Sequence, residues 1–178
     1  CDFRGRMYPA TSGLSPQGTG VSKGLLKFAE GKKLGSSGWY WFRVAGANRY
    51  GKDKISFDDR VKWIEDNSAA WKECATNPLG NLHVWGKADE PYQFLAWCIE
   101  FNNATNGNPT EYKSYLPIGM DGSCNGLQHF SAMLSDSVGG SAVNLLPHDL
   151  PSDIYQRVAD VMTAKLRSMA PTSEAAGN

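Results

Sequence analysis

The chain has 178 residues, of which 41% are hydrophobic and 11% aromatic. This is the length of one ordinary domain with enough apolar content for a buried core, which excludes a disordered chain. The 18 basic and 18 acidic residues balance, so net charge by itself predicts neither a nucleic-acid partner nor a membrane partner. No apolar run approaches the roughly 18 residues that a membrane-spanning helix requires.

In chain order, the first predicted elements are a strand and two helices. Residues 3–8 predict a strand within a Gly-, Pro- and Ser-rich start. The segment "VSKGLLKFAE", residues 21–30, predicts a short helix that ends at Gly31. Residues 36–48 predict a buried helix, because large apolar residues and small residues recur near one face.

The middle of the chain predicts two more helices. Ser56 and Asp59 resemble a capping box, with Asp in place of Glu or Gln, before a helix at 59–67. Pro91 is suited to the first position of the next helix. The following residues, 92–104, are apolar almost all round, which predicts an interior helix.

The last third of the chain predicts one strand and two helices. Residues 114–120 predict a strand, residues 125–135 a helix, and a final helix begins near Ser152. This last helix has one apolar face, formed by Ile154, Val158, Val161, Met162 and Leu166. The elements together predict a helix-rich α+β fold with a few strands and no internal repeat.

The four cysteines are scattered and form no C-x-x-C pair. This spacing indicates a reducing compartment rather than a disulfide framework. Cys74, His83 and Cys98 are conceivable zinc ligands, but their spacing matches no standard zinc site. Buried or free thiols are the expected state.

Both ends of the chain are unusual. It begins at Cys1 without an initiator Met and finishes in the small-residue run "APTSEAAGN". We interpret it as a piece of a longer protein, in which a targeting signal of the parent would not be visible.

The stretch "YLPIGMDGSCNGLQH", residues 115–129, is the strongest candidate for a functional site. Three interpretations compete for it. Asp121 could cap the following helix, which is the commonest use of such an Asp. Alternatively, Cys124 could be a nucleophile with His129 as its base, as in a Cys/His hydrolase, although their spacing exceeds the i,i+4 reach of one helical face.

In the third interpretation, Asp121 is a metal ligand. A carboxylate at the end of a strand can hold magnesium, which takes few protein oxygens and shares its shell with substrate phosphates. Gly122 has no Cβ, so its backbone carbonyl could approach the ion. Two-metal phosphoryl transfer needs at least one more acid, and Asp136 is separated from Asp121 by a whole helix. By chemistry alone this interpretation is incomplete.

The residues themselves carry a resemblance. "DGSCNGLQHFSAML" followed by "GGSAVNLLP" resembles the first catalytic palm motif of the single-subunit, bacteriophage-type RNA polymerases, a family that includes the mitochondrial enzyme. "DFRGRMYP" is similar to the D-x-x-G-R element of that family. "PQGTGVSKGLLKFAEGKKLG", "GANRYGKDKISFDDRVKWIEDN" and "DEPYQFLAWCIEF" follow in the same order. The resemblance covers residues 2 to about 168.

The resemblance implies roles for individual residues. Asp121 matches the first metal-binding aspartate, which is catalytic, and Gly122 the position whose carbonyl joins the metal shell. Arg6, with Arg4 beside it, matches the element that contacts the template–transcript hybrid. Lys54 lies where the family has a lysine near the incoming triphosphate.

Two further positions match the family pattern, Lys23 and His129. Lys23 is a candidate nucleic-acid or substrate contact, and a structural role is equally compatible with either residue. The family's second metal-binding aspartate and its substrate-binding fingers helix lie far downstream and are not in this chain, nor is the promoter-binding domain.

We therefore predict that residues 1–178 are a partial polymerase catalytic domain: the first part of a right-hand palm with a few antiparallel strands, and the root of the fingers, with no complete second domain. The implied activity is DNA-directed RNA synthesis, a nucleotidyl transfer that uses two Mg²⁺ ions in the complete enzyme. The implied partners are a DNA template, the RNA transcript, NTPs and the remainder of the polymerase chain, without a membrane.

The isolated piece is expected to be inactive, because it lacks the second aspartate. The expected compartment is the cytoplasm of an infected bacterial host, with the mitochondrion as the alternative. The alternative functions are a catalytically silent nucleic-acid-binding piece, with Arg4, Arg6, Lys23 and Lys27 as a basic strip, and the Cys/His hydrolase.

Overall fold

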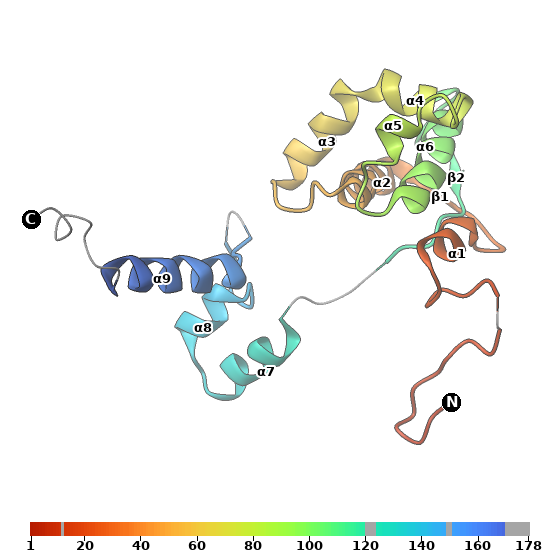
Figure 1. Ribbon diagram of the computed structural model, residues 1–178. Helices are drawn as coiled ribbons and strands as arrows, with labels where there is room; N and C mark the ends of the chain where they lie inside the picture. The colour runs from red at the N-terminus through yellow and green to blue at the C-terminus, as the bar shows by residue number, and fades with distance from the viewer. Residues whose placement is uncertain (12, 120–123, 149–150, 170–178) are drawn as a thin grey trace, which may run out of the picture. The chain divides into compact units, whose positions relative to one another are not determined.

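The computed structural model describes residues 1–11, 13–119, 124–148 and 151–169. The chain divides into two compact units, residues 1–119 and 120–178, and each is considered by itself (Figure 1). The described residues are rich in helix and contain one two-stranded antiparallel sheet. This agrees with the predicted α+β class in its helix-rich form.

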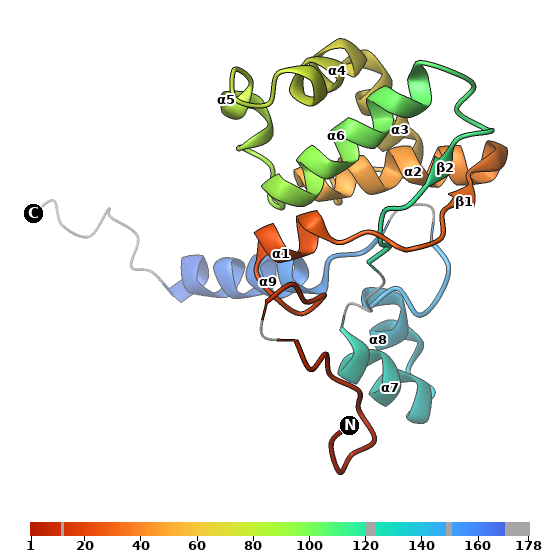
Figure 2. The same cartoon turned by 90° about the vertical axis from the view of Figure 1, so that its right-hand side faces the viewer.

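Two long helices form the centre of the first unit. α2 spans Gly35–Tyr50 and α6 spans Pro91–Thr105, as the apolar patterns predicted. They pack closely because Gly46 has no side chain: a Cβ there would overlap the indole of Trp97. Trp97 in turn donates its indole N–H to the carbonyl of Phe42 at 2.8 Å. Figure 2 shows α6 lying along α2.

Aromatic rings fill the core around this crossing. Trp97 stacks against Phe42, Phe94 and Phe101, with ring centroids 4.9–5.6 Å apart. Aromatic side chains bury large apolar areas, and such pairs add a further contribution from ring geometry. The core is therefore built mainly from the two helices that the sequence identified as buried.

Three shorter helices cover the core. α3 spans Phe57–Asp66, α4 spans Ser68–Thr76 and α5 spans Leu82–Trp85. The capping box is confirmed at the start of α3, where the Ser56 hydroxyl accepts the Asp59 backbone N–H at 3.2 Å. The Asp59 carboxylate accepts the Ser56 hydroxyl rather than its backbone N–H, because an Asp side chain is one methylene shorter than Glu. α4 and α5 were not predicted.

α1 spans Gly20–Leu25, so the helix predicted at 21–30 is too long. The chain leaves the helix at Leu26, whose ψ is 136°. It then runs extended, and the Phe28 N–H donates to the Tyr115 carbonyl at 2.8 Å. A pairing with a distant segment thus overrides the local helical pattern.

The sheet consists of β1, Lys32–Lys33, and β2, Lys113–Ser114. The strand predicted at 114–120 is therefore wrong within the described residues, since only its first residue is in β2. Two features end the pairing, one tertiary and one local. The Tyr115 N–H points to the buried carboxylate of Glu100, and Pro117 has no N–H to donate.

The strand predicted at 3–8 is also wrong. These residues form a turn, in which the Asp2 carboxylate accepts the backbone N–H groups of Arg4 and Arg6. Gly5 allows the turn with a φ of 79°. An Asp side chain that accepts hydrogen bonds from the backbone N–H groups of the residues after it competes with strand formation.

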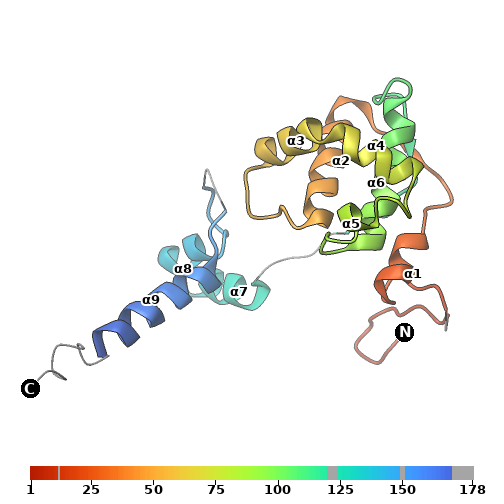
Figure 3. The same ribbon diagram turned by 45° about the horizontal axis from the view of Figure 1, so that its top comes forward.

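The described residues of the second unit form three helices, α7 at Asn125–Met133, α8 at Ser137–Ala142 and α9 at Ile154–Met169. α7 begins where predicted but ends earlier, and α9 begins within two residues of the prediction. The Asp136 carboxylate caps α8 by accepting the amides of Val138 and Gly139. The predicted apolar residues of α9 are largely exposed in this unit. Figure 3 shows the ribbon of α7, α8 and α9.

Among the helices that the structure describes, none combines the length and the apolar character needed to cross a membrane.

Candidate functional site

Asp121 and Gly122, the predicted metal ligands, lie outside the described residues. On the C-terminal side, α7 begins at Asn125 with Cys124 at its N-cap position, in the left-handed conformation with a φ of 59°. The N-cap of α7 is thus Cys124, which leaves the capping interpretation of Asp121 without support from this helix.

On the N-terminal side, Glu100 holds the segment that leads toward Asp121. This carboxylate is 1% exposed. It accepts the Ser114 hydroxyl at 2.6 Å and pairs with the Lys27 amine at 3.3 Å. A buried charge needs such compensation, so these contacts fix residues 113–115 on α6.

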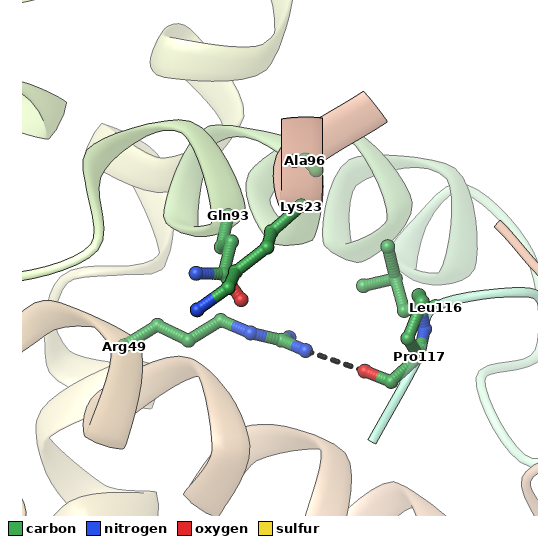
Figure 4. Close-up of a pocket in the computed structure, with 7 residues that line it drawn as sticks. Lys23, Arg49, Gln93, Ala96, Leu116 and Pro117 are labelled. Carbon is green, nitrogen blue, oxygen red and sulfur yellow. Dashed lines mark hydrogen bonds between the residues drawn. The ribbon is translucent and has the colours of Figure 1, made fainter. Parts of the chain in front are cut away.

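Arg49 holds the next part of the same segment. Its guanidinium donates to the Pro117 carbonyl at 2.8 Å, and this bond is drawn in Figure 4. Burial lowers the pKa of Arg49, while the charges of Glu90 and Glu100 oppose that shift. Arg49 also lines a small pocket together with Lys23, Gln93 and Leu116.

The N-terminal turn presents Arg4 and Arg6 differently. The Arg4 guanidinium bonds the Asp2 carboxylate at 3.0 and 3.1 Å. Asp2 has a lowered pKa, chiefly because it accepts the Arg6 backbone N–H. The Arg6 side chain is exposed and forms no ion pair within the described part of the chain. Of the two arginines, Arg6 is the one available to a phosphate.

Lys54 lies on a loop that Arg60 organises. Arg60 is 4% exposed and donates to the carbonyls of Ile55 and Asp53 at 2.9 and 2.8 Å. It also bonds the Asn48 side chain at 2.9 Å. The loop backbone is therefore fixed from inside. The Lys54 side chain is 76% exposed, and among the acidic residues that the structure describes it pairs only with its neighbour Asp53, at 3.3 Å.

The hydrolase interpretation gains no support. Within residues 124–148, His129 is exposed on α7 and no hydrogen bond joins it to Cys124. The zinc interpretation also fails, because Cys74 and Cys98 are buried while His83 is exposed. In the described part of the chain, no three His, Cys, Asp or Glu side chains are placed to hold a metal.

Three buried or half-buried charges that hold the candidate segments of the first unit were missed in the sequence: Arg49, Arg60 and Glu100. A usable signal existed for Glu100, since it is the only charged residue in the apolar run 92–104. A lone charge in an interior helix implies a partner elsewhere in the chain. Arg49 and Arg60 lie among other polar residues and carry no comparable signal.

Comparisons with known proteins agree with the predicted resemblance. A profile of the family described as DNA-dependent RNA polymerase matches residues 32–177. The chain is 46% identical over 169 residues to the T7 RNA polymerase of Escherichia phage T7, which covers 95% of this chain. It is 41% identical over 178 residues to the mitochondrial DNA-directed RNA polymerase of Schizosaccharomyces pombe, covering 99% of this chain.

A third relative is the mitochondrial DNA-directed RNA polymerase of Mus musculus, 42% identical over 160 residues and 89% of this chain. The aligned regions make up 19%, 15% and 13% of the lengths of the phage T7, fission yeast and mouse proteins. The chain therefore spans less than a fifth of these relatives. Both the profile and the relatives include the Asp121 motif region, and the chain belongs to the DNA-dependent RNA polymerase family.

Proposed function

We propose that this chain forms part of the active site of a DNA-directed RNA polymerase, which extends RNA from NTPs on a DNA template. The observation that carries the proposal is family membership over nearly the whole chain, together with the D-G-S-C motif at 121–124. We place residues 1–178 in the first part of the palm and the root of the fingers. The remainder of the polymerase would complete the site.

Asp121 and the Gly122 carbonyl are the proposed magnesium ligands. Their carboxylate and carbonyl oxygens are the donor types that Mg²⁺ prefers. Bound magnesium would help to activate the transcript 3′-hydroxyl and stabilise charge on the phosphates during transfer. A second aspartate would come from the remainder of the polymerase, as the family pattern implies.

The cationic side chains have a separate role, which is to bind phosphates. Arg6 is exposed on a turn that Asp2 fixes, and it suits a contact to the template–transcript hybrid. Lys54 projects from a loop held by Arg60, and it suits a contact to the incoming triphosphate. Arg4 and Lys23 are further candidate contacts. Phosphate contacts position a nucleic acid without reading its sequence.

The alternative function, a nucleic-acid-binding piece without catalytic activity, relied on a basic strip of Arg4, Arg6, Lys23 and Lys27. One of them, Lys27, pairs with the buried Glu100, so its charge stabilises the fold and is less available to a ligand.

For the compartment, the relatives come from phages and mitochondria. We propose the cytoplasm of an infected bacterial host, with the mitochondrion as the alternative.

The test is an Asp121→Asn substitution in a polymerase completed with the missing remainder. It should abolish nucleotide incorporation on a primed template with magnesium, while DNA binding stays nearly intact, because the change removes a metal charge and no phosphate contact. Asp66→Asn, at an exposed position of α3, is the matched control and should keep activity. Synthesis by the Asp121→Asn enzyme at the control rate would rule out this role for Asp121.

A further inference from the structure

A small pocket in the first unit brings two cations together. Lys23 comes from α1 and Arg49 from the last turn of α2, and both line the pocket with Gln93 of α6. Figure 4 shows the Lys23 and Gln93 side chains extending toward Arg49. Leu116 and Pro117 form another part of the lining. Segments that are far apart in the sequence thus converge on one point.

The two positive charges have no close carboxylate in the part of the chain that the structure describes. The ion pairs within 4.0 Å there involve neither Lys23 nor Arg49. Glu90 and Glu100 both act on Arg49 through their charges, but neither forms an ion pair with it within 4.0 Å. Glu100 is already bonded to Lys27 and Ser114. Lys23 and Arg49 repel each other across the pocket, and a bound anion in contact with both would relieve that repulsion.

The donors around the pocket suit an oxyanion. One nitrogen of the Arg49 guanidinium donates to the Pro117 carbonyl. A guanidinium has five N–H donors in all, so others are left for a ligand. The Lys23 ammonium offers three donors and the Gln93 amide two. The planar guanidinium of Arg and the ammonium of Lys are the usual protein ligands of phosphate.

The scaffold around the pocket is rigid on two sides. α1 approaches α6 so closely that a Cβ on Gly24 would lie 2.9 Å from the backbone of Tyr92. This contact places Lys23 next to Gln93, one residue further along α6. Arg49 is held on the other side by its bond to Pro117.

We propose that Lys23, Arg49 and Gln93 form a binding site for one phosphate group, either a phosphodiester of bound nucleic acid or a phosphate of a free nucleotide or pyrophosphate. The proposal deepens the proposed function, on which it relies only for the source of the phosphate. It adds Arg49 and Gln93 to the phosphate contacts and gives Lys23 a defined partner. Because Arg49 also holds Pro117, an occupied pocket would touch the segment that leads toward Asp121.

The experiment is an NMR titration of the 178-residue chain, which follows the side-chain Nε–Hε signal of Arg49. Sodium pyrophosphate is added at constant ionic strength, with sodium chloride as the reference. We expect a saturable shift of this signal with pyrophosphate and none with chloride. Lys23→Gln, at an exposed position of α1, should weaken binding roughly fivefold, as expected for the loss of one partly exposed charge contact.

Lys62→Gln is the matched control, since Lys62 is exposed on α3 and does not line the pocket. It should change the affinity by less than about twofold, the scale of a weak surface charge effect. Arg49→Lys keeps the charge but loses the forked donors, and it should also weaken binding while a thermal melt reports whether the fold survives. No saturable shift, or equal weakening by Lys23→Gln and Lys62→Gln, would overturn the site.

A second titration with a short oligothymidylate identifies the source. Competition with pyrophosphate for the Arg49 signal would assign the site to the nucleic-acid backbone, and a response to pyrophosphate alone would assign it to free phosphates. This assay requires no RNA synthesis. If the pocket binds no phosphate, the result of the Asp121 experiment is unaffected. If Asp121→Asn keeps its activity, the evidence for phosphate binding in the pocket is likewise unaffected.

Discussion

Buried and half-buried charges connect the first unit to its candidate functional segments. Glu100 bonds Ser114 and Lys27, Arg49 bonds Pro117, and Arg60 bonds the loop that carries Lys54. Each charge is satisfied by groups on a different element. Removing one partner would leave the other buried and unpaired, which costs far more than the net contribution of the bond. These residues therefore position the backbone of the candidate segments at 53–55 and 113–117.

At the residue scale, Cys98 should make stability depend on alkaline pH. The thiol is fully buried beside Cys74, and burial raises the pKa of Cys98. The unfolded thiol ionises above about pH 8.5 while the folded one keeps its proton, so the folded state binds more protons there. This contribution is complete below that pH and is lost as pH rises, by up to about 1.4 kcal/mol per pH unit.

The measurement is urea unfolding at neutral and alkaline pH for the wild type and Cys98→Ala. The variant should be less stable at neutral pH because it leaves a small cavity. Its free energy of unfolding should nevertheless fall less steeply with pH. Identical slopes for the two proteins would show that the thiol ionises equally in both states.

The second prediction at the residue scale concerns Arg6. Its exposed side chain, on the turn fixed by Asp2, should contact one phosphate in a completed polymerase. Arg6→Ala should then weaken transcript retention and reduce the salt dependence of binding by roughly one phosphate contact. Lys87→Ala, at an exposed position after α5, should leave the salt slope unchanged. A slope for Arg6→Ala equal to that of the wild type would exclude the contact.

At the element scale, the packing of α2 on α6 depends on one glycine. Gly46→Ala would push a methyl group into the indole of Trp97, which belongs to the fully buried core. We expect a loss of about 1–3 kcal/mol in the free energy of unfolding, as is typical of overpacked cores. Urea denaturation measures it directly.

The same helix provides the control. Gly38 also lies in α2, but a Cβ there would meet only Leu34 at an ordinary 3.4 Å. Gly38→Ala should therefore stabilise the protein by about 0.5–1 kcal/mol through helix propensity. Equal effects of the two substitutions would mean that backbone propensity, and not the contact with Trp97, decides the outcome at Gly46.

At the scale of the whole molecule, the chain holds only part of the proposed catalytic machinery. It spans 19% of the phage T7 relative and 15% of the fission yeast relative. The proposed metal site offers Asp121 and one backbone carbonyl. Magnesium bound by one carboxylate keeps most of its waters and is held weakly without a substrate triphosphate.

The isolated 178-residue chain should therefore show no templated RNA synthesis. The assay is nucleotide incorporation on a primed template with magnesium, and the polymerase completed with the missing remainder is the positive control. Robust synthesis by the chain alone would mean that it contains a second catalytic acid, and the proposed division of the site would then be wrong.

Family and helix content could be predicted from the sequence because both depend on local pattern. The apolar runs at 36–48 and 92–104 became α2 and α6, and the capping box at Ser56 was found in place. The D-G-S-C motif identified the family before any geometry was known. Side-chain periodicity and short motifs are properties of neighbouring residues, so they survive without tertiary information.

Tertiary structure decided where α1 ends, helped to end β2, and set the environment of the charges. The helix predicted at 21–30 stops at Leu25 because Phe28 pairs with Tyr115, and the strand at 114–120 is cut short by the buried Glu100 and by Pro117. The convergence of Lys23 with Arg49 likewise needs α1, α2 and α6 in place. Such contacts join residues far apart in the chain, and their free energy exceeds the small local preferences that a sequence pattern reports.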